Sequence, residues 1–204
     1  MSSRDEIFSR IRKALPPEEE RPKRPEFVNG DLLSRPRLEG SSLWDTFKRN
    51  FEAVNGRAME SVGALADFLL EREFSTGYCD PRLMDRVGSP LAERGLQVET
   101  VFERSRYDDY QFGITRATGA IAESGSLIFD DESTSDRLAA LSPWVHVGLL
   151  ERHELIRSIP EAVDRFGASS NIVWATGPSK TADVEGILIE GVHGPGEEIA
   201  LLLE

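Results

Sequence analysis

Cysteine is almost absent from this sequence: Cys79 is the only one among 204 residues. A single cysteine excludes an internal disulfide, a cysteine-based zinc site and an iron–sulfur cluster held by this chain alone. The stretch "STGYCDPR" has two interpretations, a reactive thiol or an ordinary, partly buried cysteine at the end of a strand. Because unpaired cysteines most often behave as small apolar side chains, the second is favoured.

Long apolar runs and an excess of positive charge are also missing. No segment approaches the roughly 18 apolar residues that a membrane-spanning helix needs, and "MSSRDEIFSR" lacks the apolar core of a signal peptide. The 24 Lys and Arg against 36 Asp and Glu give a net charge of −12. Binding to a nucleic-acid backbone requires clustered Lys and Arg, so we expect no nucleic-acid partner. Because apolar segments of the required length are missing, we also expect a cytoplasmic protein with no membrane span.

The N-terminal part is rich in proline and charge. Residues 16–40, "PPEEERPKRPEFVNGDLLSRPRLEG", contain five prolines, a composition typical of an extended arm or linker. Before it, Ser3 and Glu6 have the spacing of a capping box and open a helix with one apolar face. That face would dock either on its own domain or on a partner subunit. The length suits one core, so we predict an N-terminal helix and proline-rich arm at 1–40 and one domain at 41–204.

Beyond the arm, helical and strand patterns alternate. Helices are expected at 41–54, 62–71, 81–87, 136–142, 160–166 and 180–188, the fifth opened by a capping box of Ser158 and Glu161. Strands are expected at 74–80, 96–102, 143–151, 171–177 and 198–204, and hairpin-like breaks are expected within 113–131. Alternation of this kind favours an α/β fold with a largely parallel sheet.

Standard catalytic fingerprints are missing. No G-x-G-x-x-G follows a strand, no G-x-S-x-G elbow occurs, and "TGPSKT" has the wrong glycine spacing for a phosphate-binding loop. His146, His153 and His193 do not show H-E-x-x-H spacing, and His153 is expected at the surface. We therefore predict no metal site and no cofactor held by this chain alone.

Turn residues gather where the expected strand 171–177 ends. Residues 177–179 lead into an expected helix that begins at about Lys180. Backbone N–H groups at that helix start, with the side chains of Ser179, Lys180 and Thr181, would form a cradle for a small anion at the carboxyl end of the sheet. Alternatively, Ser179 or Thr181 only caps the helix.

Three further positions are candidates for a site. Glu123, in "AIAESGS", either caps a turn or projects into a cleft, where burial would raise its pKa and suit it to acid/base or nucleophilic work. His193 stands between glycines in "GVHGPGE", where the backbone can approach a ligand closely. Strand alternation places His146 on one face with Trp144 and Gly148, either under a helix or in a site.

Taken together, "AIAESGSLIF", "LSPWVHVGLL" and "TGPSKTADVEGILIEGVHGPGE" closely resemble the LUD-domain family of lactate-utilisation proteins, in its small LutC/YkgG branch. Order and spacing agree, and the likeness covers about residues 41–204. The resemblance implies a Rossmann-like mixed sheet similar to the sugar-phosphate isomerase and coenzyme A transferase superfamily. The family pattern falls on Glu123, Ser124, Gly125, His146, Gly177, Pro178, Ser179, Thr181, Asp183, Glu185, His193, Gly194 and Pro195.

The resemblance also implies a function. It suggests a cluster-free component of a system that oxidises L-lactate to pyruvate together with two iron–sulfur partner proteins. This component would be either an accessory subunit that organises the redox partners or a subunit that binds a small carboxylate or phosphate. This chain has no redox-cofactor motif and cannot be the whole oxidase. One alternative is a stand-alone isomerase- or acyl/CoA-transferase-like enzyme, because "AESG" resembles the "SENG" of coenzyme A transferases and Glu123 would match their nucleophile. The other alternative is a metabolite-sensing binding module.

Overall fold

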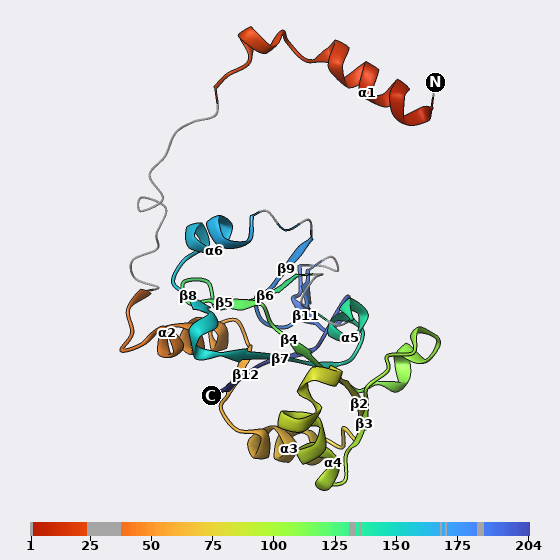
Figure 1. Ribbon diagram of the computed structural model, residues 1–204, viewed down its shortest axis with the longest axis vertical. Coiled ribbons are helices and arrows are strands. Elements are labelled where there is room, and N and C mark those ends of the chain that lie inside the picture. The colour runs from red at the N-terminus through yellow and green to blue at the C-terminus, as the bar shows by residue number, and fades with distance from the viewer. Residues whose placement is uncertain are drawn as a thin grey trace. The chain divides into compact units, whose positions relative to one another are not determined.

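The computed structural model describes residues 2–23, 38–130, 134, 136–167, 169, 171–182 and 186–204. The chain divides into two compact units, Met1–Leu32 and Leu33–Glu204. The first contains helix α1 (Ser3–Ala14) and a 3₁₀ turn, η1 (Glu18–Glu20), drawn in red in Figure 1. The middle of the predicted proline-rich arm, residues 24–37, lies outside the described residues.

Helix α1 begins with a capping box one residue earlier than predicted. The Ser2 hydroxyl accepts from the Asp5 N–H, and the Asp5 carboxylate accepts from the Ser2 N–H at 3.0 Å. The predicted Ser3–Glu6 box is therefore wrong, because the Glu6 carboxylate pairs with Arg10 one turn later. The helix has its predicted apolar face, and none of its residues is buried.

Six strands of the second unit form a parallel sheet in the order β1-β12-β7-β4-β2-β3. The strands are β1 (Arg57–Met59), β2 (Thr76–Cys79), β3 (Gln97–Glu99), β4 (Phe112–Arg116), β7 (Val145–Glu151) and β12 (Glu197–Leu203). The three central strands are almost entirely buried, as expected for a parallel sheet covered on both faces. The predicted α/β fold with a largely parallel sheet is confirmed.

Helices cover one face of this sheet. They are α3 (Val62–Glu71), a 3₁₀ turn (Pro81–Leu83), a π-helical turn (Met84–Gly88) and α4 (Ser89–Glu93). Leu65, Leu69 and Leu91 pack there against Ile114 and Val147. A further 3₁₀ segment, Arg104–Asp109, precedes β4. Among the described residues, no helix has the length and apolar character that a bilayer crossing requires.

A second, smaller sheet and helix α2 (Leu43–Glu52) cover the other face (Figure 1). The second sheet has the order β8-β5-β6-β9, with strands β5 (Gly119–Ile121), β6 (Ser126–Asp130), β8 (Leu155–Ile156) and β9 (Ile172–Ala175). Its outer side carries α6 (Ile159–Phe166), and α5 (Arg137–Leu141) contacts β4 and β7. A 3₁₀ turn, Arg152–Glu154, follows β7.

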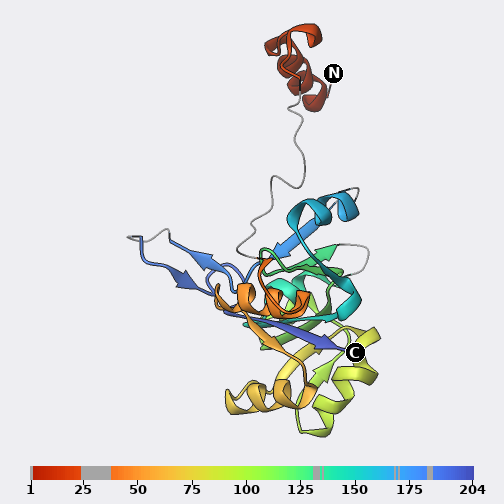
Figure 2. The same ribbon diagram turned by 90° about the vertical axis from the view of Figure 1, so that its left-hand side faces the viewer.

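The predicted helix at 180–188 is wrong for the residues that the structure describes. They form a hairpin of β10 (Lys180–Thr181) and β11 (Ile189–Glu190), which stands out from the body in Figure 2. The reason is a set of non-local backbone partners: the Ser179 N–H donates to the Pro195 carbonyl and the Gly191 N–H donates to the Ser179 carbonyl, both at 2.9 Å. Residues 179–181 form backbone hydrogen bonds with residues 189–195 and not within a local helix.

Candidate functional site

A cavity of about 390 Å³ lies at the amino ends of β7 and β12, on the side of the parallel sheet that faces the second sheet. His146 and Glu198, each the second residue of its strand, form its polar floor. The walls are Phe129 and Asp130 of β6, residues 173–175 of β9, Thr134, part of α5, and the loops 176–179 and 193–195. Its volume is typical of pockets that enclose small molecules.

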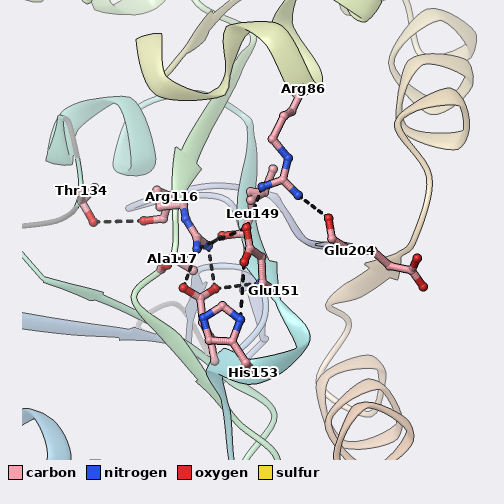
Figure 3. A network of polar contacts seen from close by, with 9 residues as sticks. Arg86, Arg116, Ala117, Thr134, Leu149, Glu151, His153 and Glu204 are labelled. Atoms are coloured by element: carbon pink, nitrogen blue, oxygen red, sulfur yellow. Dashed lines mark hydrogen bonds and ion pairs between the residues drawn. The ribbon is translucent and has the colours of Figure 1, made fainter.

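The cavity lies at the edge opposite to the one predicted. The carboxyl ends of β4 and β7 are tied together by charged side chains instead (Figure 3). Arg116 donates to the Glu154 carboxylate at 2.7 Å and to the Leu149 carbonyl at 3.1 Å, and Arg86 pairs with Glu151 at 2.6 Å. Residues 191–196 lead into the start of β12, and Ser179 is joined to Pro195, so the turn residues 176–179 and 193–195 lie at the amino edge of the parallel sheet.

Two loops that are distant in sequence form one wall of the cavity. The Ser179 N–H bond to Pro195 joins them, and a Cβ on Gly194 would lie only 3.1 Å from the Ser179 Cβ. Gly177 has φ +76°, and a Cβ there would lie 2.4 Å from the Val54 carbonyl oxygen. Glycine is required at 177 because no other side chain combines that backbone angle with so close a contact.

The floor is a buried chain of three side chains on adjacent strands. The Thr115 hydroxyl of β4 lies 2.8 Å from His146 Nε2, and His146 Nδ1 lies 2.8 Å from Glu198 Oε1. All three residues are at most 2% exposed. Burial raises the pKa of Glu198, while the neighbouring His146 opposes that shift. These three side chains meet because β4, β7 and β12 are neighbours in the sheet.

Glu198 also faces the cavity. Its Oε1 is engaged by His146, whereas Oε2 makes no hydrogen bond to a described residue. Among the described residues, Arg57 Nε is the one side-chain atom that is both fully buried and without a hydrogen-bond partner. Since Glu198 Oε2 also lacks a partner, it is not fully buried. A carboxylate oxygen in this position needs a donor from water or a ligand.

Charged and polar groups surround the rest of the cavity. Arg137 of α5 and His193 are exposed at its wall, and Asp130 ends strand β6 there. The guanidinium of Arg137 has five donors and suits a carboxylate or phosphate. The imidazole of His193 makes no hydrogen bond to any residue that the structure describes. The cavity therefore combines a buried carboxyl group at its floor with the side chains of Arg137 and His193 at its wall.

Glu123, Ser124 and Gly125 do not line the cavity. The Glu123 carboxylate accepts from the Ile159 N–H at 3.1 Å and so caps α6. The predicted Ser158–Glu161 capping box is wrong, because the Ser158 side chain makes no cap bond and Glu161 accepts from the Arg157 N–H instead.

Ser124 and Gly125 belong to the turn between β5 and β6. The Ser124 hydroxyl contacts Ser126, which contacts Thr176 at the cavity wall, each at 2.7 Å. Gly125 has φ +64°, and a Cβ there would lie 2.3 Å from the Phe51 nitrogen. Its role is therefore one of close backbone packing.

Lys180 and Thr181 also lie off the cavity, and the predicted cradle at a helix start is not formed by the described residues. The Lys180 ammonium donates to the Val54 carbonyl at 2.8 Å and lies 3.3 Å from the Glu190 carboxylate. Asn55 donates to that carboxylate too, and together these contacts lower the pKa of Glu190. Lys180 thus fastens the hairpin to the loop after α2. Asp183 and Glu185 lie outside the described residues.

Of the predicted ligand-binding residues, the structure brings His146, residues 177–179, His193 and Gly194 to one cavity. Sequence reasoning missed Thr115, Glu198 and Arg137. A usable signal was the glutamate pair that opens the apolar strand "EEIALLL", since a charged residue at the start of a buried strand needs a partner.

Cys79 is buried at the end of β2, away from the cavity. Burial raises the pKa of its thiol to about 12, so it carries almost no thiolate at neutral pH. The structural interpretation of Cys79 therefore holds. No group of three or more His, Cys, Asp or Glu side chains within the described ranges is arranged to hold a metal ion.

The buried carboxyl predicts a pH dependence of stability. Folded protein binds the Glu198 proton more tightly than the unfolded chain, so unfolding releases it. Stability from this group is present below the ordinary glutamate pKa of about 4.3 and is lost as pH rises through the raised folded pKa. In Glu198→Gln, this decrease in stability with rising pH should be absent. Melting temperatures of both proteins from pH 4.5 to 8 test this; a constant difference would contradict it.

Comparison with known proteins identifies a family and several relatives of this chain. Residues 86–203, more than half of the chain, match the family model described as the LUD domain. A Deinococcus radiodurans protein named lactate utilization protein C is 30% identical over 105 residues, 49% of this chain and 50% of that protein. The Bacillus subtilis protein of that name is 28% identical over 99 residues, 45% of this chain and 41% of that protein. The chain thus spans about half the length of these relatives.

Two other matches are longer. An uncharacterized protein of Neisseria meningitidis serogroup B is 29% identical over 167 residues, which cover 78% of this chain and 70% of that protein. The crystal structure of a DUF162 family protein from Deinococcus radiodurans superposes with a TM-score of 0.58 at 18% identity, over 79% of this chain and 96% of that chain. This structural likeness supports the fold.

Proposed function

Because the chain belongs to the LUD domain family, we propose that it serves in lactate utilization by binding a small organic anion in the cavity at the amino edge of its parallel sheet. The observation that carries this proposal is the composition of the cavity. Two separate loops, 176–179 and 193–195, line the cavity beside a buried His146–Glu198 pair, and the side chains of Arg137 and His193 lie at its wall. Convergent polar groups in an otherwise apolar pocket are typical of ligand sites.

The proposal includes partners. Oxidation of lactate to pyruvate releases two electrons and needs an acceptor. One cysteine cannot ligate an iron–sulfur cluster. We therefore propose that this chain is the cluster-free component and that two iron–sulfur proteins accept the electrons. Affinity purification at low salt from cells that express all three proteins should recover them together. Recovery of this chain alone, under conditions where both partners are soluble, would argue against an assembly.

The ligand itself is tested with His193. We expect L-lactate, pyruvate or phosphate to raise the melting temperature of the full chain, and His193→Ala to weaken binding about tenfold, the value of one hydrogen bond to a charged group. The melting temperature without ligand should hardly change, since His193 is exposed and makes no bond to a described residue. Calorimetric titration of both proteins measures the difference.

His153→Ala is the matched control. Its side chain is 71% exposed and lies 3.4 Å from Glu151 at the opposite edge of the sheet. Its affinity for ligand should equal that of the unmodified protein. A large loss of stability in His193→Ala, without a change in affinity, would mark His193 as structural.

The enzyme proposed around Glu123 has less support, because that carboxylate caps α6 and does not line the cavity. A metabolite-sensing role would use the same cavity. It differs from the first proposal in requiring ligand binding without iron–sulfur partners, so the purification experiment separates the two.

A further inference from the structure

We infer that Glu198 contacts the ligand and recognises the hydroxyl group of a 2-hydroxy carboxylate, with His146 and Thr115 as positioning residues. The inference rests on the proposed function. It names the substrate class and the residue by which the cavity separates a hydroxy acid from the matching keto acid.

One carboxylate oxygen of Glu198 makes no hydrogen bond to a described residue. The side chain is buried and belongs to the cavity lining, its Oε1 is held by His146, and its Oε2 makes no hydrogen bond to any described residue. A desolvated carboxylate oxygen that lacks a donor is costly. A ligand that brings an O–H group to this oxygen supplies the missing hydrogen bond, whereas a second anion placed there would be repelled.

His146 holds the carboxyl group of Glu198 in place. Both ring nitrogens have partners at 2.8 Å, Thr115 on one side and Glu198 on the other. If the Thr115 hydroxyl donates to Nε2, the proton of the neutral ring sits on Nδ1 and points at Glu198. If the ring is charged, the same hydroxyl accepts instead. In both states Oε1 stays engaged and Oε2 stays available to the ligand.

The cavity wall has both polar and apolar side chains. His193 can donate a hydrogen bond to the carboxylate of the ligand, and Phe129, Leu141 and Trp174 offer apolar surface to the remaining substituent. A volume of about 390 Å³ is in the range that encloses molecules well above three carbons in size. The cavity therefore has room for lactate and also for a 2-hydroxy acid with an apolar group larger than a methyl.

Hydroxy and keto acids differ at the atom that meets Glu198. Ionised Glu198 accepts a hydrogen bond from a hydroxyl and repels a keto oxygen, whereas protonated Glu198 can donate to a keto oxygen. The hydroxy acid should therefore bind with proton release and the keto acid with proton uptake. The other ionisable groups that face the cavity are Asp130 on β6, Arg137 on α5, His146 on β7 and His193 in the loop before β12.

The experiment uses calorimetric titration of the full chain with two pairs of acids, L-lactate with pyruvate and phenyllactate with phenylpyruvate, at pH 6 and pH 8. We expect a preference for each hydroxy acid that grows with pH, and tighter binding of the larger pair. Glu198→Gln should lose ten- to a hundredfold of that preference, the value of a hydrogen bond to a charged group, together with its pH dependence. Thr115→Val should keep the preference but shift its pH profile, as expected of a positioning residue.

Glu154→Gln is the matched control, a mostly buried carboxylate whose side chain is 12% exposed and lies at the opposite edge. It should keep both preference and pH profile. Titration of the unmodified protein in two buffers of different ionisation enthalpy counts the protons exchanged, so the inference stays testable even if Glu198→Gln folds poorly.

The outcomes separate the inference from its premise. If none of the four acids binds the unmodified protein, the proposed function is lost and the inference with it. If the acids bind, but Glu198→Gln keeps the same hydroxy-over-keto ratio or binding exchanges no protons, Glu198 does not read the hydroxyl and the proposed function stands.

Discussion

Gly113→Ala should lower the free energy of unfolding by at least about 3 kcal/mol, the upper range for overpacking a tightly packed core. A Cβ at position 113 would lie 1.9 Å from the carbonyl oxygen of Ala139 and 3.1 Å from Pro143 Cγ. The first of these is a backbone atom of α5, so a side-chain rotation cannot relieve the clash. Helix α5 must move away from β4, and the cavity wall that it carries moves with it. Urea denaturation measures the loss, and ligand titration should show weakened binding as well.

Gly63→Ala provides the control for this prediction. Gly63 lies in the first turn of α3, where an added Cβ would find its nearest neighbour, Ser61 Oγ, at 3.4 Å. Alanine favours a helix over glycine by up to about 1 kcal/mol, so stability should stay the same or rise. A loss in Gly113→Ala no larger than the change in Gly63→Ala would show that α5 can shift freely.

His146→Leu should cost about 3 kcal/mol near pH 8, because it leaves the Glu198 carboxyl and the Thr115 hydroxyl without their partner in a buried site. The loss should be smaller at pH 5, since protonation of Glu198 removes the uncompensated charge. Chemical denaturation at the two pH values measures the difference.

The double variant His146→Leu/Glu198→Leu separates the hydrogen bond between the two side chains from their packing. Replacing both members of a buried pair by apolar side chains is often close to neutral, so most of the lost stability should return. A double variant as unstable as the sum of its single changes would mean that His146 contributes through shape alone.

Local pattern was enough to predict the framework. Helix α3 occurs at the predicted residues 62–71 because Leu65, Ala66 and Leu69 recur at helical spacing and pack on the sheet. The alternation of β7 also holds: Val147 packs toward the helices, whereas His146 and Gly148 face Phe129 of the second sheet.

What the sequence could not supply depended on contacts between distant segments. The hairpin at 180–190 replaced a helix because its hydrogen-bond partners follow it in the chain. The cavity lies at the edge opposite to the predicted one, because strand order and loop direction are properties of the topology. Thr115 and Glu198 were missed because they stand 31 and 52 residues from His146 and meet it only when β4, β7 and β12 are neighbours.

The position of β12 in the sheet has a consequence for biosynthesis. It is the last described strand to leave the ribosome, yet it lies between β1 and β7, so β1 has no partner in the sheet until β12 inserts. Pairing between such distant segments is slow. During translation, the edge of β7 that later pairs with β12 therefore has no partner strand. We expect chaperones to bind most strongly to chains arrested before residue 197.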